Sequence, residues 1–158
     1  MTVLNKGAPN RIRRLALAWM ACGVILPLAA CRQAGRKETW LNVEVFSYID
    51  HVITNIIFNG TDLGVMNRYG ATGSIINVWI PFGVQTLHWE LDGPEGTPRM
   101  GEVVTAKGPL VISPGQITPR TRYLGIHLYP DDTVEFTFSD GLPEVTARGR
   151  NILAARRK

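Results

Sequence analysis

This chain of 158 residues is short of the residue types on which many active sites depend. It has two cysteines, Cys22 and Cys31, and three histidines, His51, His88 and His127. None of the five is spaced like a metal-binding motif. No serine lies in a Gly-x-Ser-x-Gly elbow, and no glycine-rich loop is followed by the lysine of a phosphate loop. We therefore expect no catalytic residues, no metal site and no cofactor.

The few candidate polar groups fit ordinary positions. His88 alternates to the polar side of an apolar run, which indicates a solvated side chain. His127 lies opposite an aliphatic series, so we expect it at the surface or between sheets rather than in a catalytic site. Asp131 and Asp132 follow a proline, and Ser139 precedes Asp-Gly, which predicts turns at both places.

What the chain does contain begins with its N-terminal segment. Residues 1–14 carry four basic residues and no acidic one, and residues 15–30 carry no charge. A spanning helix needs about 20 apolar residues, and this run has sixteen, with Pro27 among them. A basic region, an apolar region and a small-residue exit are typical of a cleaved secretory signal.

The exit reads Leu28-Ala29-Ala30-Cys31, which resembles the lipobox of bacterial lipoproteins. The resemblance implies cleavage between Ala30 and Cys31, a diacylglycerol on the Cys31 sulfur and a further acyl chain on the new N-terminus. Two or more acyl chains hold a protein stably on a membrane. The alternative is an ordinary secreted protein with a chance cysteine. Arg32 stands where aspartate favours the inner membrane, so we expect the outer membrane, with the domain facing the periplasm.

Cleavage also changes the charge. The whole chain is +4, but the part from Cys31 onward has 13 basic and 13 acidic residues. Residues 38–147 hold all 13 acidic residues against five basic ones, a net charge of −8. We therefore expect no nucleic-acid partner. The basic ends could rest on anionic lipid headgroups, or they could be solvated tails.

Period-two alternation, β-branched residues and frequent turn signals predict short strands through the rest of the chain. We expect an all-β fold, a small antiparallel β-sandwich of six to eight strands, either immunoglobulin-like or a partly open barrel. The runs at 39–50 and 52–58 are close enough to pair, and Asn59-Gly60 predicts a tight turn. The expected organisation is a signal peptide (1–30), a lipidated tether (31–38), the sandwich (39–142) and a basic tail (143–158) with a frayed helical turn or two at 151–158.

The tryptophans differ in their pattern. Trp89 alternates with leucines and is expected in the core. Trp40 and Trp79 are also expected in the core, although an exposed one would be a candidate anchor for a partner, because tryptophan is enriched at interaction hot spots. The turn-rich segments 61–73 and 108–121 are the loops expected to carry an interface.

Four pieces of the sequence occur in a characteristic order: "IIFNG" (56–60), "YGATGSIINVWIP" (69–81), "TLHWELDG" (86–93) and "YLGIHLYPDDTVEF" (123–136). On these pieces the chain resembles an uncharacterised family of small proteobacterial lipoproteins, a domain of unknown function. Many members carry adjacent cysteines at the place of Ile76 and Asn77, so this chain departs from the family there.

The resemblance implies a function, because members often lie beside type VI secretion phospholipase effectors and are proposed as their immunity proteins. The expected protein is therefore an acylated periplasmic lipoprotein that binds and neutralises a lipase effector. The alternative is a structural or assembly lipoprotein of the envelope without a toxin partner. A module that binds a small ligand would need an apolar pocket, and an enzyme is the least favoured class.

Overall fold

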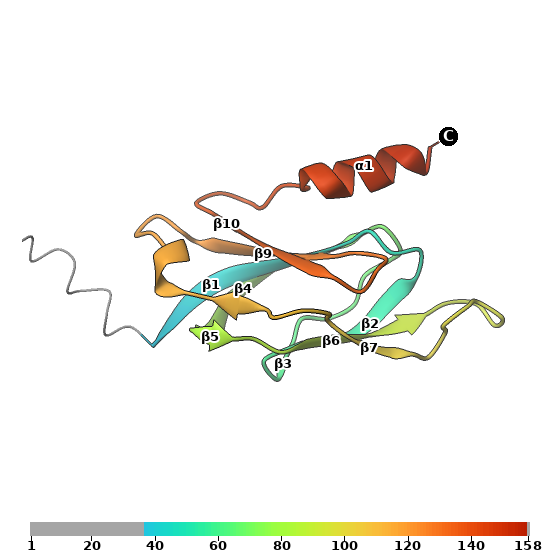
Figure 1. Ribbon diagram of the computed structural model, residues 1–158, viewed down its shortest axis with the longest axis horizontal. Helices are drawn as coiled ribbons and strands as arrows, with labels where there is room; N and C mark the ends of the chain where they lie inside the picture. The colour runs from blue at the N-terminus through green and yellow to red at the C-terminus, as the bar shows by residue number, and fades with distance from the viewer. Residues whose placement is uncertain (1–36, 158) are drawn as a thin grey trace, which may run out of the picture.

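The computed structural model describes residues 37–157, so Ala30 and Cys31 lie outside the described residues. The described part is built from strands, with one α-helix close to the C-terminus (Figure 1). In chain order the elements are β1 (Glu38–Ser47), β2 (Val52–Phe58), β3 (Thr61–Asp62), β4 (Ala71–Pro81), β5 (Gly83–Val84), β6 (Leu87–Asp92), β7 (Val103–Thr105), β8 (Val111–Ile112), the 3-10 turn η2 (Pro114–Gln116), β9 (Tyr123–Leu128), β10 (Val134–Ser139) and α1 (Ala147–Ala155).

Two four-stranded sheets make up the sandwich, with strand orders β10-β9-β1-β4 and β3-β2-β6-β7. A two-stranded sheet of β5 and β8 lies beside them. The all-β sandwich predicted from the sequence is thus confirmed, and seven of the described strands have three or more residues. Among the named strands one pairing is not antiparallel: β1 runs parallel to β9, from Asn42 opposite Tyr123 to Ser47 opposite Leu128.

The expected pairing of the first two strands is wrong, because β1 and β2 lie in different sheets. Both edges of β1 are occupied by β4 and β9. The chain continues past β1 with the Tyr48 backbone N–H donating to the Leu128 carbonyl at 3.0 Å, then bends at Asp50 and His51. The short link between the strands therefore crosses from one sheet to the other.

The Asn59-Gly60 turn is confirmed. Asn59 and Gly60 have φ angles of 49° and 81°, and Phe58 pairs with Thr61 across them. Positive φ at both central residues defines the type I′ turn that suits the twist of a two-residue hairpin. This turn joins β2 to β3.

The core lies between the two large sheets and is aliphatic and aromatic. The prediction for Trp89 is confirmed, since its side chain is fully buried. The predicted hairpin of β9 and β10 is also present, with Leu124, Ile126 and Leu128 facing the core. Burying an aliphatic or aromatic side chain of this size stabilises the fold by about 1.5–3 kcal/mol.

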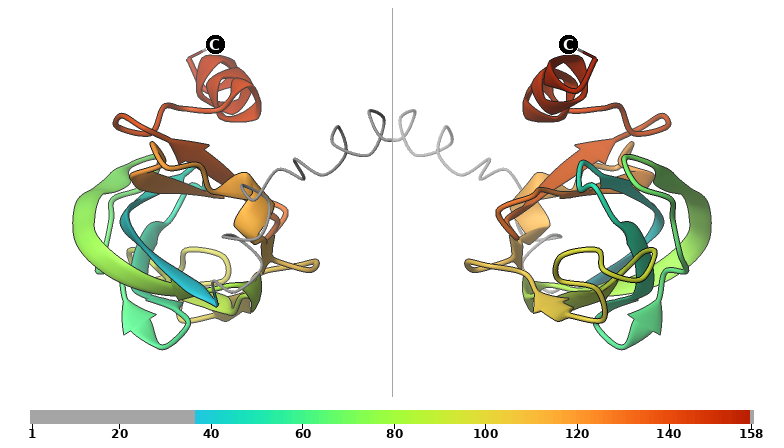
Figure 2. Two further views of the ribbon diagram at one scale, coloured as in Figure 1. Left: turned by 90° about the vertical axis from the view of Figure 1, so that its left-hand side faces the viewer. Right: turned by 90° about the vertical axis from the view of Figure 1, so that its right-hand side faces the viewer.

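The C-terminal segment folds against the outer side of the β10-β9-β1-β4 sheet (Figure 2). Its helix starts at Ala147, four residues before the turn expected at 151–158. Thr146 caps the helix by accepting a hydrogen bond from the Gly149 N–H at 3.0 Å, a favourable N-cap arrangement. Gly149 is buried against the ring of Tyr48, where a Cβ would overlap the ring. This close approach explains why glycine stands in a helix.

Candidate interaction surface

Trp40 and Trp79 face each other across β1 and β4 on the outside of the sandwich. They are partners in the register of the two strands, and their exposed fractions are 54% and 40%. The Trp79 indole N–H donates to the Glu38 carboxylate at 2.9 Å. The expectation that both lie in the core is wrong, because the strand alternation that buries Leu41 and Val78 turns their tryptophan neighbours outward.

A β-bulge shapes the strand next to this pair. Ile76 and Asn77 together lie opposite the single residue Asn42. Asn77 has a φ of 58°, and its backbone N–H donates to the Asn42 side-chain oxygen at 3.1 Å. The bulge leaves Ile76 three-quarters exposed. Ile76 and Asn77 therefore form a bulge on the surface of this chain.

A shallow pocket of about 290 Å³ adjoins Trp40. Asn42 and Asn77 line one part of it, and residues 119–122 line the rest through Pro119, Thr121 and Arg122. The end of the 108–121 loop is thus brought beside Trp40. No acidic residue lines the pocket, and among the described residues the Arg122 side chain has no ion-pair partner.

The pair of tryptophans lies where the described chain begins, at an end of the molecule that we name the tether end. The β5–β8 sheet is at the same end, because the Phe82 N–H donates to the Lys37 carbonyl at 2.9 Å (Figure 1). Val84 and Val111 face each other across that sheet, with exposed fractions of 75% and 47%. The tether end comprises Lys37, Trp40, Trp79, Val84, Val111, Arg120 and Arg122, all of them exposed.

The other segment predicted to carry an interface, residues 61–73, is packed against the rest of the fold. Leu63 and Met66 are buried, and Met66 exchanges two backbone hydrogen bonds with Ile53 at 2.9 Å. Tyr69 lies under the guanidinium of Arg156, at 4.3 Å from the ring centroid. Much of this segment therefore makes structural contacts, with β2 through Met66 and with the end of α1 through Tyr69.

His127 is fully buried, so the expected surface position is wrong. It does not lie between the two large sheets either, because the core side of β9 carries Leu124, Ile126 and Leu128. It points away from the core, into a cluster that the C-terminal segment encloses. Its ring stacks on Phe46 with centroids 4.9 Å apart. Its Nδ1 lies 3.0 Å from the Tyr48 hydroxyl, and its Nε2 lies 3.0 Å from the Thr137 hydroxyl. Burial lowers the pKa of His127 to about 4, so the imidazole is neutral at pH 7.

A second buried tyrosine continues the cluster toward the helix. The Tyr129 hydroxyl donates to the Glu135 carboxylate at 2.6 Å and lies 2.7 Å from the Thr146 hydroxyl. Arg148 covers the ring, 3.7 Å from its centroid. Burial, with the hydrogen bond to Glu135, raises the pKa of Tyr129 to about 12. The helix is therefore attached through polar contacts as well as through the glycine.

The row Thr137–His127–Tyr48 has the connectivity of a nucleophile, a base and an orienting group, which the sequence did not indicate. Its electrostatics favour a structural role. A general base must become an imidazolium, and burial disfavours that ion at His127. The group that orients His127 is the neutral phenol of Tyr48, whereas a catalytic triad uses a carboxylate to stabilise the imidazolium.

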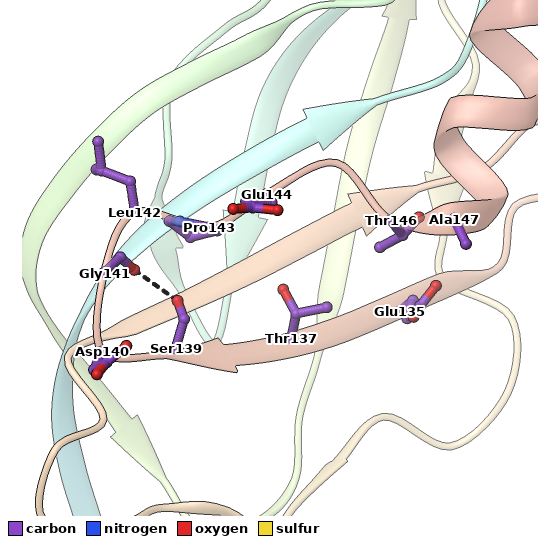
Figure 3. A pocket seen from close by; sticks show the side chains of 10 residues that line it. All are labelled: Glu135, Thr137, Ser139, Asp140, Gly141, Leu142, Pro143, Glu144, Thr146 and Ala147. Atoms are coloured by element: carbon purple, nitrogen blue, oxygen red, sulfur yellow. Dashed lines mark hydrogen bonds between the residues drawn. The ribbon is translucent and has the colours of Figure 1, made fainter.

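Thr137 does reach a groove of about 480 Å³ between β10 and residues 140–147 (Figure 3). Three carboxylates line it, those of Glu135, Asp140 and Glu144. Ser139, at its end, donates to the Gly141 carbonyl at 2.7 Å, which matches the turn predicted there. The groove collects part of the negative charge of the domain on one open surface.

The predicted Asp131-Asp132 turn is present and is bound by basic residues. Asp132 accepts from Lys107 at 2.9 Å and Arg99 at 3.1 Å, and Asp131 accepts from Arg148 at 2.8 Å. Desolvation acts to raise the pKa of Asp132, but the hydrogen bonds from Lys107 and Arg99 outweigh it and hold the pKa below its usual range. The two aspartates therefore hold the turn against the segments that carry Arg99, Lys107 and Arg148.

The remaining histidines are apart from the buried cluster. His51 lies with its Nε2 at 2.6 Å from the Pro98 carbonyl, and His88 is half-buried on β6. Within residues 37–157, no three histidine, cysteine or acidic side chains are grouped so that they could hold a metal ion. The same stretch has no helix with the length and apolar character needed to cross a bilayer.

Comparison with known proteins found no matching family model, curated protein or solved structure.

Proposed function

We propose that this chain is a bacterial lipoprotein, acylated at Cys31 and held on the outer membrane, whose sandwich binds and neutralises a type VI secretion lipase effector in the periplasm. The observation that carries the proposal is the order of parts along the chain. A signal and a lipobox end at Cys31, and the first strand of the folded domain begins at Glu38. An anchored domain on so short a tether works at the membrane surface, which is where a lipase finds its substrate.

Neutralisation by binding requires no chemistry from this chain. The sandwich would cover the mouth of the lipase active site, and the anchor would raise its concentration at the membrane. The charge of −8 over residues 38–147 favours encounter with a basic partner, because complementary charge mainly accelerates association. Asp140 and Glu144 are carboxylates on the acidic groove that have no ion-pair partner among the described residues.

The experiment is co-expression of a lipase effector encoded beside this gene, directed to the periplasm, with and without this protein. Protection by the wild-type chain is expected. Asp140→Lys with Glu144→Lys should slow association and weaken its salt dependence, while Glu95→Lys, an exposed substitution in the loop between β6 and β7, serves as the control. Equal killing of the cells by the effector with and without this protein would refute the proposal.

The anchor is tested separately with Cys31→Ala. The variant should lose the mass of the acyl groups and move from the membrane fraction to the soluble fraction, because no other thiol remains after signal removal. Cys22→Ala, within the signal, should leave acylation unchanged. Retained acylation in Cys31→Ala would contradict the lipoprotein assignment.

An envelope defect in a deletion strain that encounters no effector would instead favour the alternative, a structural or assembly lipoprotein.

A further inference from the structure

We infer that the tether end of the domain is a membrane-contact surface, which seats the sandwich on anionic phospholipid headgroups of the bilayer that carries the anchor. The inference rests on the proposed acylation of Cys31 and adds an orientation to it. It assigns the exposed tryptophans to lipid rather than to a protein partner.

The apolar side chains at this end are of the kind that enters a bilayer interface. Trp40 and Trp79 lie side by side in register, each with about half of its surface exposed. Tryptophan combines an apolar body with a polar N–H and is enriched at the level of the headgroups. Val84 and Val111 add apolar surface on the adjoining sheet.

The charges at this end complement an anionic surface. Lys37, Arg120 and Arg122 are exposed, and none forms an ion pair with the described acidic residues. Basic residues beside an anionic bilayer are attracted to it. The nearby acid Glu38 is held by the indole N–H of Trp79. The tether end thus carries unpaired positive charge although the domain as a whole is negative.

The chain length limits where this end can be. Trp40 is the ninth residue after Cys31, so even a fully extended tether keeps Trp40 within about 30 Å of the acylated residue. The ten residues of β1 alone span about 33 Å. Figure 1 places the start of β1 and the β5–β8 sheet at one end of the long axis, with α1 and the loop between β6 and β7 toward the other. Of the two ends, the one with the tryptophans is the nearer to the bilayer.

The test uses the fluorescence of the acylated full-length protein, purified from membranes and reconstituted in vesicles. The vesicles contain equal parts of phosphatidylethanolamine and phosphatidylglycerol, with or without acyl chains brominated near the headgroup. Trp40→Phe and Trp79→Phe report on the tryptophans one at a time, since Trp89 is buried in the core. Contact with the bilayer should blue-shift their emission, allow quenching by bromine and reduce quenching by aqueous iodide about twofold.

Charge reversal provides the second arm. Arg120→Glu with Arg122→Glu should reduce bromine quenching about twofold, whereas Arg157→Glu, an exposed substitution in the C-terminal segment, should leave it unchanged. Circular dichroism confirms that each variant is folded.

Two results would overturn the inference. In the first, iodide quenches Trp40 and Trp79 equally well in the vesicle-bound protein and in the Cys31→Ala protein, which serves as the lipid-free and detergent-free reference. The other is protection of the tryptophans only when the effector is added, which would assign the surface to a protein partner. Vesicle flotation and the acyl mass report on the anchor, and protection from killing reports on neutralisation. A failure of the proposed function is therefore distinguishable from a failure of this surface.

Discussion

The burial of His127 makes a quantitative prediction about stability and pH. In the folded protein its pKa is about 4, lowered from 6.5 by desolvation. The unfolded chain therefore binds a proton at this residue between pH 6.5 and 4 while the folded chain does not. Stability falls as the pH drops through this range, because protonation favours the unfolded state. The pKa difference corresponds to a loss of about 3 kcal/mol.

Urea unfolding measured from pH 8 to pH 4.5 tests this, with His127→Gln as the comparison. The wild-type free energy of unfolding should be flat above pH 7 and then fall with a slope approaching about 1.4 kcal/mol per pH unit. The variant has no titrating group at this position, so the contribution of His127 to the slope should be absent from it, whatever its stability at pH 7.

Burial raises the pKa of Glu44, which acts with the opposite sign as the pH approaches 4.5, but equally in wild type and variant. The aspartates with shifted pKa values act at lower pH. Hydrogen bonds from Thr133 and Arg148 hold the pKa of Asp131 below its usual range, and the pKa of Asp132 is lowered as well. Stability due to these carboxylates is lost as the pH falls below about 4. An equal slope in wild type and His127→Gln between pH 6.5 and 4.5 would refute the reasoning.

Two further predictions concern the attachments of the C-terminal half. Gly149→Ala should destabilise the fold, because overlap with Tyr48 costs about 1–3 kcal/mol against a helix-propensity gain of about 1 kcal/mol. Asn151→Ala, exposed in the same helix, should be neutral or stabilising in the same thermal melts, and a stabilised Gly149→Ala would contradict the close contact. Asp132→Asn keeps a residue that tolerates the positive φ of 64° but removes the ion pairs that Asp132 makes with Arg99 and Lys107, while Arg99 keeps its ion pair with Glu102. Chemical denaturation should show that the free energy of unfolding falls by about 1 kcal/mol. An unchanged free energy of unfolding would mean that these ion pairs do not stabilise the fold.

Local features were predictable because they depend on neighbouring residues. The Asn59-Gly60 turn follows from the tolerance of both residues for positive φ. The β9–β10 hairpin and the burial of Trp89 follow from alternation within one strand or across one turn. Side chains alternate between the two faces of a strand, so the apolar face can be recognised from the sequence alone.

Features that depend on distant pairing were not predictable. Alternation with Leu41 puts Trp40 on the other side of its strand, but only the sheet order, with β1 between β4 and β9, shows that this side is left exposed there. His127 has the alternation of an outward-facing residue, and it does point away from the core. It is buried because residues from the far C-terminal segment cover that side of the sheet, with Gly149 against Tyr48.

The sequence by itself determined the all-β class, the turns and the apolar strand faces such as the one that carries Trp89, because these arise from side-chain chemistry at short range. It also carries the basis for the proposed anchor, since a lipobox is a linear signal. Only the tertiary structure decided which side chains meet on the surface. The tether end gathers residues from β1, β4, β5, β8 and the loop before β9, and that gathering is set by non-local strand pairing and by the bulge in β4.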